Sequence, residues 1–266
     1  MALHRPLILL EALLYLYTFI IESHEGPLND RIIGGHEVAP HSKPWMAYIT
    51  YTNDAGERLV CGGFLISRDL VMTAAHCAGS NIKVSLGLHY LRDRNDQNTF
   101  PVYKIYRHNN YDSKTHDSDI MILRINQEVT LSDAIQVITL PKKNKRVAVG
   151  TVCNVAGWGQ AGEDSMSQVL MEVNVTVVGN KKCEELLSVP ISSAMMCAGQ
   201  PGTTGDAAQG DSGSPLVCGG VPIGIVSFGH EKPPGAYTHI PSFLPWIRKI
   251  IVPFSKPALT SKAHLY

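Results

Sequence analysis

We expect an all-β protein, because two features of the sequence point to many short strands. From Ile32 onward, short runs rich in β-branched and aromatic residues alternate with clusters of turn-forming residues. Glycine (23 residues) and proline (16 residues) are frequent, which suits a chain with many turns. Several short strands at this spacing are typical of a sandwich or a barrel.

The expected strands follow one another along most of the chain. The first ends at a turn cluster, Asn53–Gly56, and later runs are separated by similar polar segments. The strands are expected at residues 45–51, 60–66, 82–86, 102–106, 120–125, 151–156, 169–178, 215–218 and 222–228.

Only one segment has clear helical periodicity, and it lies near the end of the chain. Behind Pro241-Ser242, apolar residues recur at three- and four-residue spacing. They are Phe243, Trp246, Ile247, Ile250 and Ile251. Beyond this helix, residues 252–266 carry two prolines and no period, and we expect a surface tail.

The N-terminal segment has the features of a secretory signal. His4-Arg5 precede an apolar run from Leu7 to Ile21, interrupted by Glu11 and short for a membrane span. We expect a signal peptide at 1–23, a propeptide at 24–31 and a main domain at 32–251, with a linker at about 127–144. An uncleaved membrane anchor is the alternative for the first segment. If the signal peptide is cleaved, we expect a secreted protein with no membrane partner.

Charge and cysteine content narrow the classes of partner and cofactor. Lysine and arginine (23) balance aspartate and glutamate (23), so no nucleic-acid partner is indicated. Six cysteines behind a signal peptide favour disulfides, and six cysteines allow 15 pairings. Clustered metal-ligand spacing is lacking, so we expect no metal and no cofactor.

Three separated motifs supply the residue types of nucleophilic catalysis. His76 lies in Thr73–Cys77, Asp119 opens an apolar run, and Ser212 lies in Gly210-Asp211-Ser212-Gly213. A serine hydroxyl is a weak nucleophile that needs a base, and the base needs an orienting group. With Arg31-Ile32-Ile33-Gly34-Gly35 upstream, the chain resembles the chymotrypsin-like, or trypsin-fold, serine proteases over residues 32–251.

The resemblance implies a fold and a division of roles. It implies two six-stranded antiparallel barrels with the active site between them, and a C-terminal helix. Ser212 would be the nucleophile, His76 the general base, and Asp119 the buried orienting acid. Asp112 and Asp117 lie in the same polar segment and are the rival acids.

The same resemblance implies an oxyanion hole and a zymogen. The N–H groups of Gly210 and Ser212 would hold the oxyanion. Cleavage after Arg31 would free the Ile32 ammonium, which would pair with Asp211. The family usually has glycine where this chain has Ser214, and the added hydroxymethyl group would crowd the loop.

The resemblance also implies a primary specificity pocket. Asp206 would form its floor, and Gly229 and Gly235 its walls, open to a long side chain. Ser227 would bond the triad acid, with Phe228 beside it. A carboxylate at the floor favours substrate arginine, then lysine. The alternatives are an apolar or other specificity, if Asp206 points to solvent, and an inactive protease-like binding protein.

Within the family, the chain resembles the granzymes and mast-cell proteases of leukocytes. Ala208 replaces a cysteine of the digestive enzymes, and the opening 32–42 is similar to this subgroup. The implied disulfides are Cys61–Cys77, Cys153–Cys218 and Cys183–Cys197.

Partners and modification follow from the same comparison. Protein or peptide substrates and serine protease inhibitors are the expected partners. A propeptide ending in Arg31 suits a trypsin-like activating protease, and leukocyte secretory granules are a route of secretion that the subgroup suggests. Asn174-Val175-Thr176 is a glycosylation acceptor sequence. Leu88 stands where digestive relatives carry a calcium-binding glutamate.

Overall fold

The computed structural model describes residues 35–160, 165–199, 210–229 and 233–251. The expected signal peptide, propeptide and C-terminal tail lie outside these ranges, as do Arg31, Ile32 and Asp206. None of the helices within the described ranges is long and apolar enough to cross a membrane.

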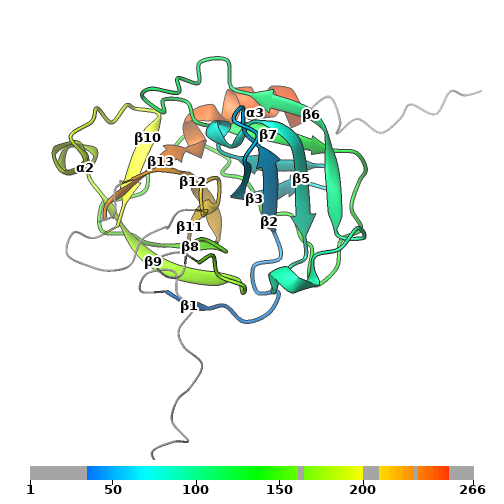
Figure 1. The fold of residues 1–266 in the computed structure, drawn as a ribbon. Helices are drawn as coiled ribbons and strands as arrows, with labels where there is room; N and C mark the ends of the chain where they lie inside the picture. Colours follow the sequence, from blue (N-terminus) through cyan, green and yellow to red (C-terminus); the bar gives the residue numbers. More distant parts are fainter. Residues whose placement is uncertain (1–34, 161–164, 200–209, 230–232, 252–266) are drawn as a thin grey trace, which may run out of the picture. The chain divides into compact units, whose positions relative to one another are not determined.

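Six antiparallel strands close the first barrel (Figure 1). They are β2 (Met46–Thr52), β3 (Arg58–Ser67), β4 (Leu70–Thr73), β5 (Ser80–Leu86), β6 (Thr99–Arg107) and β7 (Met121–Ile125). Their order around the barrel is β2-β3-β4-β7-β6-β5, so β4 and β7 are neighbours. This pairing aligns Thr73 with Met121, which brings the ends of the His76 and Asp119 motifs together.

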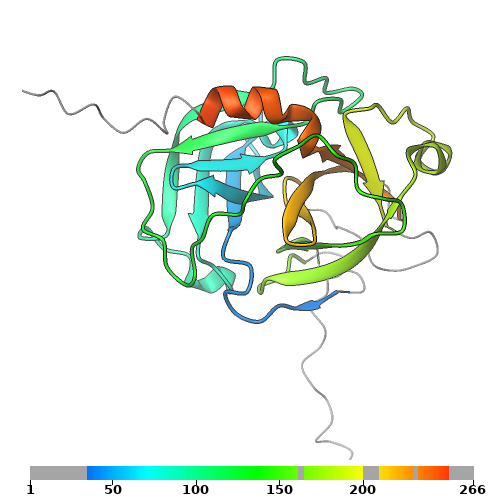
Figure 2. The same ribbon diagram turned by 180° about the vertical axis from the view of Figure 1, so that it is seen from behind.

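The second barrel closes in the same way, and Figure 2 shows it from behind. Its strands are β8 (Val152–Gly157), β9 (Met171–Val178), β10 (Met195–Ala198), β11 (Pro215–Cys218), β12 (Val221–Phe228) and β13 (Gly235–His239). The order is β9-β10-β13-β12-β11-β8, and β8 pairs back to β9. A short strand, β1 (His36–Glu37), adds to β9. The two six-stranded barrels are those that the resemblance implies.

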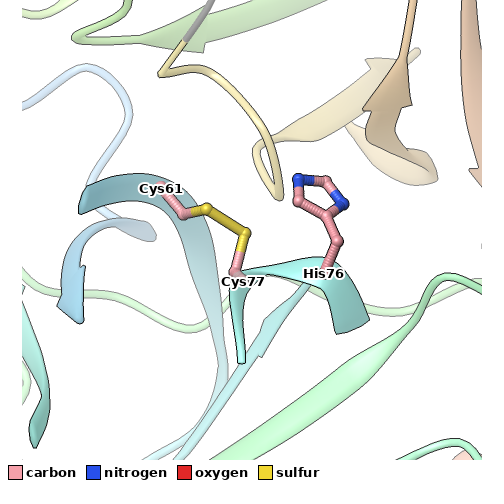
Figure 3. A group of neighbouring side chains, drawn as sticks. All are labelled: Cys61, His76 and Cys77. Carbon is pink, nitrogen blue, oxygen red and sulfur yellow. A yellow bond between two sulfur atoms is a disulfide. The ribbon is translucent and has the colours of Figure 1, made fainter. Parts of the chain in front are cut away.

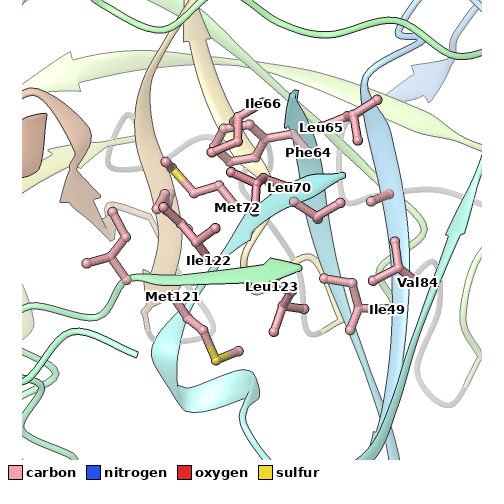
Figure 4. Close-up of a cluster of buried hydrophobic side chains, with 14 of the residues drawn as sticks. Ile49, Phe64, Leu65, Ile66, Leu70, Met72, Val84, Met121, Ile122 and Leu123 are labelled. Atoms are coloured by element: carbon pink, nitrogen blue, oxygen red, sulfur yellow. The ribbon is translucent and has the colours of Figure 1, made fainter. Parts of the chain in front are cut away.

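Each barrel encloses its own apolar core. In the first, Ile49, Phe64, Leu65 and Met72 are fully buried and belong to one cluster of apolar side chains, part of which Figure 4 shows. In the second, valines of β8 and β9 pack against Leu216. Burying such side chains contributes about 1.5–3 kcal/mol each relative to leaving them exposed.

The C-terminal helix is confirmed with a small change at its start. A 3₁₀ turn, η4 (Ile240–Phe243), precedes the α-helix α3 (Leu244–Ile251). Pro241 suits the first turn, because the missing N–H has no partner there in any helix. Ile247 and Ile250 then pack on the core of the first barrel.

The prediction of a single helix was wrong. A second helix, α2 (Asn180–Leu187), follows β9 directly after Gly179. It is short and mostly polar, so its periodicity is weak, and its buried residues are Cys183 and Leu187. The Cys183–Cys197 disulfide ties it to β10.

Four strands were also missing from the sequence-based expectation: β1, β4, β10 and β13. β4 and β10 have four residues each, all buried, so they lack the alternation that marks a half-buried strand. All five residues of β13 are buried as well. The connection between the barrels runs from 126 to 151, so it extends beyond the C-terminal end of the expected linker.

The three disulfides join the pairs that the resemblance implies. Cys61 on β3 bonds Cys77, and Cys153 on β8 bonds Cys218 on β11. No described cysteine is free.

Candidate active site

Asp119 is buried at the entrance to β7, where three hydrogen bonds converge on its carboxylate. The His76 ring nitrogen Nδ1 lies 2.7 Å from Oδ2, and the Ser227 hydroxyl donates to the same oxygen at 2.6 Å. The His76 backbone N–H donates to Oδ1 at 2.9 Å. The Thr238 hydroxyl holds the Asp119 carbonyl at 2.8 Å, so both the backbone and the side chain are fixed.

The electrostatics of Asp119 keep it ionised. Burial raises the pKa of its carboxyl, but the hydrogen bonds and charge of His76 and the Ser227 hydroxyl outweigh burial and hold it below the ordinary value. An ionised carboxylate has no proton to donate, so Nδ1 of His76 carries the hydrogen of their bond. In the neutral ring, Nε2 is then left as a proton acceptor.

His76 is positioned by the 3₁₀ turn η2 (Ala75–Cys77) directly after β4. The next residue, Cys77, is joined to Cys61 on β3, so a covalent bond anchors the turn (Figure 3). His76 and these sulfurs lie close enough to suggest a metal cluster. Both sulfurs are joined in the Cys61–Cys77 disulfide, and disulfide sulfurs are not thiolate ligands, so this group does not indicate a metal site.

The two rival acids have other environments. Asp112 is exposed and accepts the backbone N–H groups of Lys114 and Thr115. Asp117 accepts a hydrogen bond from the Ser192 hydroxyl at 2.7 Å. Of the three, only Asp119 has a described contact with His76.

The loop that carries Ser212 lies against the first barrel. The Gly62 N–H donates to the Ser212 carbonyl at 2.8 Å, and this carbonyl lies 3.8 Å from Sγ of Cys77, the neighbour of His76. The Gly213 N–H is held by the Val226 carbonyl at 2.9 Å. Ser212 therefore comes to the same edge of the barrels as His76, although 136 positions separate them in the numbering.

Two positions in this loop require glycine. Gly210 has φ +95° and Gly213 has φ +86°, a region that L side chains rarely adopt. A Cβ on Gly213 would also collide with the Thr73 hydroxyl. Within the described part of the chain, neither the Gly210 nor the Ser212 N–H donates a hydrogen bond.

Asp211 and Ser214 are both fully buried beneath the loop. The Gly159 N–H donates to the Asp211 carboxylate at 2.9 Å. The Ser214 hydroxymethyl group occupies space left by two distant glycines, since a Cβ on Gly62 would overlap Ser214 Oγ and one on Gly157 would lie 3.3 Å from it. The loop therefore accommodates the residue that was expected to crowd it.

The remaining pocket residues lie at the end of β12, directly after it, and at the start of β13. Phe228 ends β12, Gly235 begins β13, and a Cβ on Gly229 would lie 3.4 Å from the Gly235 Cα. The two glycines thus face each other across a narrow gap. Asp206, the expected floor, lies outside the described residues.

Sequence reasoning missed His116. Its ring centroid lies 6.0 Å from that of His76 and 5.1 Å from that of Phe228. The backbone has φ +57°, and no local pattern distinguishes this histidine from the others. Only the fold places it beside the site.

Comparison with known proteins agrees with this geometry. The family model described as Trypsin matches residues 32–247. The chain belongs to the trypsin family.

Individual relatives place it further within the trypsin family. Granzyme-like protein 1 of Rattus norvegicus is 44% identical over 223 residues, covering 82% of this chain and 90% of that protein. Mast cell protease 8 of Mus musculus is 42% identical over 228 residues, covering 85% and 92%. The solved structure named "Structure of GrC" is 36% identical, with a TM-score of 0.78, and covers 83% of this chain and 100% of that one.

The family and these relatives make the chain a serine endopeptidase of the granzyme and mast-cell protease type, acting on protein substrates.

Proposed function

We propose that His76, Asp119 and Ser212 form the catalytic triad of an endopeptidase that cleaves after arginine and, more slowly, after lysine. The observation that carries the triad is the buried Asp119 carboxylate, which bonds both the backbone and Nδ1 of His76. This arrangement fixes the ring and leaves Nε2 as the base.

The chemistry follows from these positions. The Ser212 oxygen attacks the scissile carbonyl carbon while its proton passes to Nε2 of His76. The N–H groups of Gly210 and Ser212 stabilise the resulting oxyanion. His76 then gives the proton to the leaving amine, and an acyl-enzyme on Ser212 remains. Water hydrolyses this ester by the same proton route in reverse.

Arginine specificity rests on Asp206 and on the two facing glycines. Gly229 and Gly235 carry no side chains that could fill the pocket, which supports a slot open to a long substrate side chain. A carboxylate at its end would bind a guanidinium through two parallel hydrogen bonds. Ala207 beside it offers no hydroxyl to a lysine ammonium, so arginine is preferred.

The chain is made as a zymogen in this proposal. Cutting after Arg31 creates the Ile32 ammonium, a charge that is costly to bury without a partner. Asp211 is a buried acid in the oxyanion loop and is the expected partner. Its pairing would draw the loop into the catalytic form, and a trypsin-like protease would make the cut.

We also propose that the protein is secreted. The expected signal peptide, 1–23, would be removed, and residues 24–31 would be the activation propeptide. Asn174 is exposed on β9, which supports its use as a glycosylation acceptor. Leukocyte granules and serine protease inhibitors are part of the same proposal.

Specificity can be tested at Asp206. The parent enzyme should cleave after arginine about a hundredfold faster than after phenylalanine, because an apolar side chain would leave a buried carboxylate unpaired. Asp206→Ser should abolish the preference and keep slow cleavage after apolar residues. The measurement is kcat/KM of the parent and of the variant on matched peptides with arginine, lysine or phenylalanine before the cleaved bond. Equal rates on arginine and phenylalanine in the parent would show that Asp206 does not line the pocket.

Ser227 should contribute to the ionisation of Asp119. Ser227→Ala removes one donor, so the Asp119 pKa should rise toward its ordinary value. A lowered folded-state pKa contributes stability above the unfolded pKa and loses it as pH falls through the folded one. The variant should therefore unfold in acid at a higher pH than the parent, by circular dichroism, and kcat should fall by about tenfold.

The matched control is Ser192→Ala, which removes the corresponding hydroxyl from Asp117. It should leave kcat unchanged. Equal losses of kcat in the two variants would contradict the special role of Asp119.

A further inference from the structure

His89 is a buried histidine whose ring bonds the first described strand, β1. Its side chain is 3% exposed, and its Nε2 lies 2.8 Å from a carboxylate oxygen of Glu37. A carboxylate only accepts hydrogen bonds, so Nε2 carries the hydrogen and donates it. Nδ1 of the same ring is buried and has no hydrogen-bond partner among the described residues. Glu37 is therefore the one polar partner that the described part of the chain offers to this ring.

The backbone of His89 is tied to the segment that holds Asp211. The His89 carbonyl accepts the indole N–H of Trp158 at 3.1 Å and the Leu170 N–H at 2.9 Å. Trp158 is buried, and the next residue, Gly159, donates its N–H to the Asp211 carboxylate at 2.9 Å. One residue thus connects β1, through its side chain, to the segment that bonds Asp211, through its backbone.

The strand pairing places β1 close to Asp211. Glu37 pairs with Met171 on β9, and Met171 pairs with Gly157 on β8 (Figure 1). Neighbouring strands lie about 4.8 Å apart, so about 10 Å separates the Cα atoms of Glu37 and Gly157. Gly157 adjoins the carboxylate, because a Cβ there would collide with Oδ1 of Asp211.

The length of chain before Glu37 is sufficient to span this separation. Ile32 precedes Glu37 by five residues. Five extended residues span at most about 18 Å. A terminus created at Ile32 can therefore reach Asp211 while Glu37 stays in place. A short tether also keeps the effective concentration of that terminus at Asp211 high.

We propose that His89 is a positioning residue for activation: by holding Glu37, it keeps the new terminus at Ile32 beside Asp211. This inference rests on the proposed pairing of Ile32 with Asp211. β1 has only two residues, so its pairing with β9 supplies few other bonds. Loss of the Glu37 carboxylate would also leave a buried N–H of His89 unpaired. The Ile32 ammonium would then leave Asp211 more often.

The test measures how fast cyanate carbamylates the Ile32 amine of the activated enzyme at neutral pH, read by mass spectrometry. A paired, buried amine reacts only while it is released, so the rate reports the released fraction. Glu37→Ala should raise the rate about tenfold, with exposed lysines reacting as in the parent. Glu37→Gln keeps an acceptor oxygen for Nε2–H and should restore most of the protection. Adding His89→Leu to Glu37→Ala should cause no further increase, because both changes remove the same bond.

The matched control is His36→Ala, which changes the neighbouring residue of β1. The His36 side chain is 67% exposed and contacts Glu172 at the surface, so its loss should leave the carbamylation rate of Ile32 unchanged. The inference is overturned if Glu37→Ala reacts no faster than the parent. It is also overturned if His36→Ala and Glu37→Ala accelerate the reaction equally, since any loosening of β1 would then suffice.

The parent enzyme separates failure of this inference from failure of the proposed activation. If Ile32 of the activated parent reacts as fast as the amine of a free peptide that begins Ile-Ile-Gly-Gly, the ammonium is not paired with Asp211, and both proposals fail. If Ile32 is protected in the parent and equally protected in Glu37→Ala, the pairing stands and only the role of His89 is contradicted.

Discussion

Ser212→Ala should lower kcat of the activated enzyme by a factor on the order of 10⁶, with the fold intact. Ser212 is only partly buried, so loss of its hydroxyl should leave the fold intact and affect the chemistry. His76→Ala should cause a loss of similar size. The double variant should be no slower than either single variant, because nucleophile and base act as one unit. Peptide hydrolysis at saturating substrate measures all three.

The thermal unfolding curve of Ser212→Ala serves as the control and should match that of the parent. A hydrolysis rate within tenfold of that of the parent would contradict the assignment of Ser212 as the nucleophile. Losses that multiply in the double variant would show that the two residues act separately.

Arg31→Gln should leave the protein nearly inert after treatment with trypsin, whereas the parent becomes active. The substitution removes the cleavage site, so the Ile32 ammonium never forms and the proposed ion pair between Ile32 and Asp211 cannot be made. N-terminal sequencing, together with the rate on an arginine peptide before and after trypsin, measures both steps.

The matched control is Arg68→Gln, an exposed arginine in the turn between β3 and β4. It should be activated like the parent. An uncut parent that hydrolyses arginine peptides as fast as the cut form would refute the pairing of Ile32 with Asp211.

The residues of the catalytic site could be predicted because each lies in a short local motif. His76 is followed by a cysteine, Asp119 precedes an apolar strand, and Ser212 lies between glycines that the turn requires. The long strands β2, β3 and β9 were also predictable, because their runs of β-forming residues are bounded by turns.

Other features depend on residues far apart in the sequence. β4 and β10 are too short and too uniformly buried to show a period. The space for Ser214 exists because Gly62 and Gly157 meet it from different barrels. His116 comes beside His76 only through the path of its loop, with ring centroids 6.0 Å apart. Local sequence patterns do not predict such contacts between residues far apart in the chain.

The most direct test of the account is cleavage of a diverse peptide library by the activated chain, read by mass spectrometry, beside Ser212→Ala treated in the same way. We predict that the parent cuts after arginine, then lysine, and that Ser212→Ala cuts at none of these bonds. Cleavage by the parent spread equally over phenylalanine, leucine and arginine, or cleavage that persists in Ser212→Ala, would contradict it.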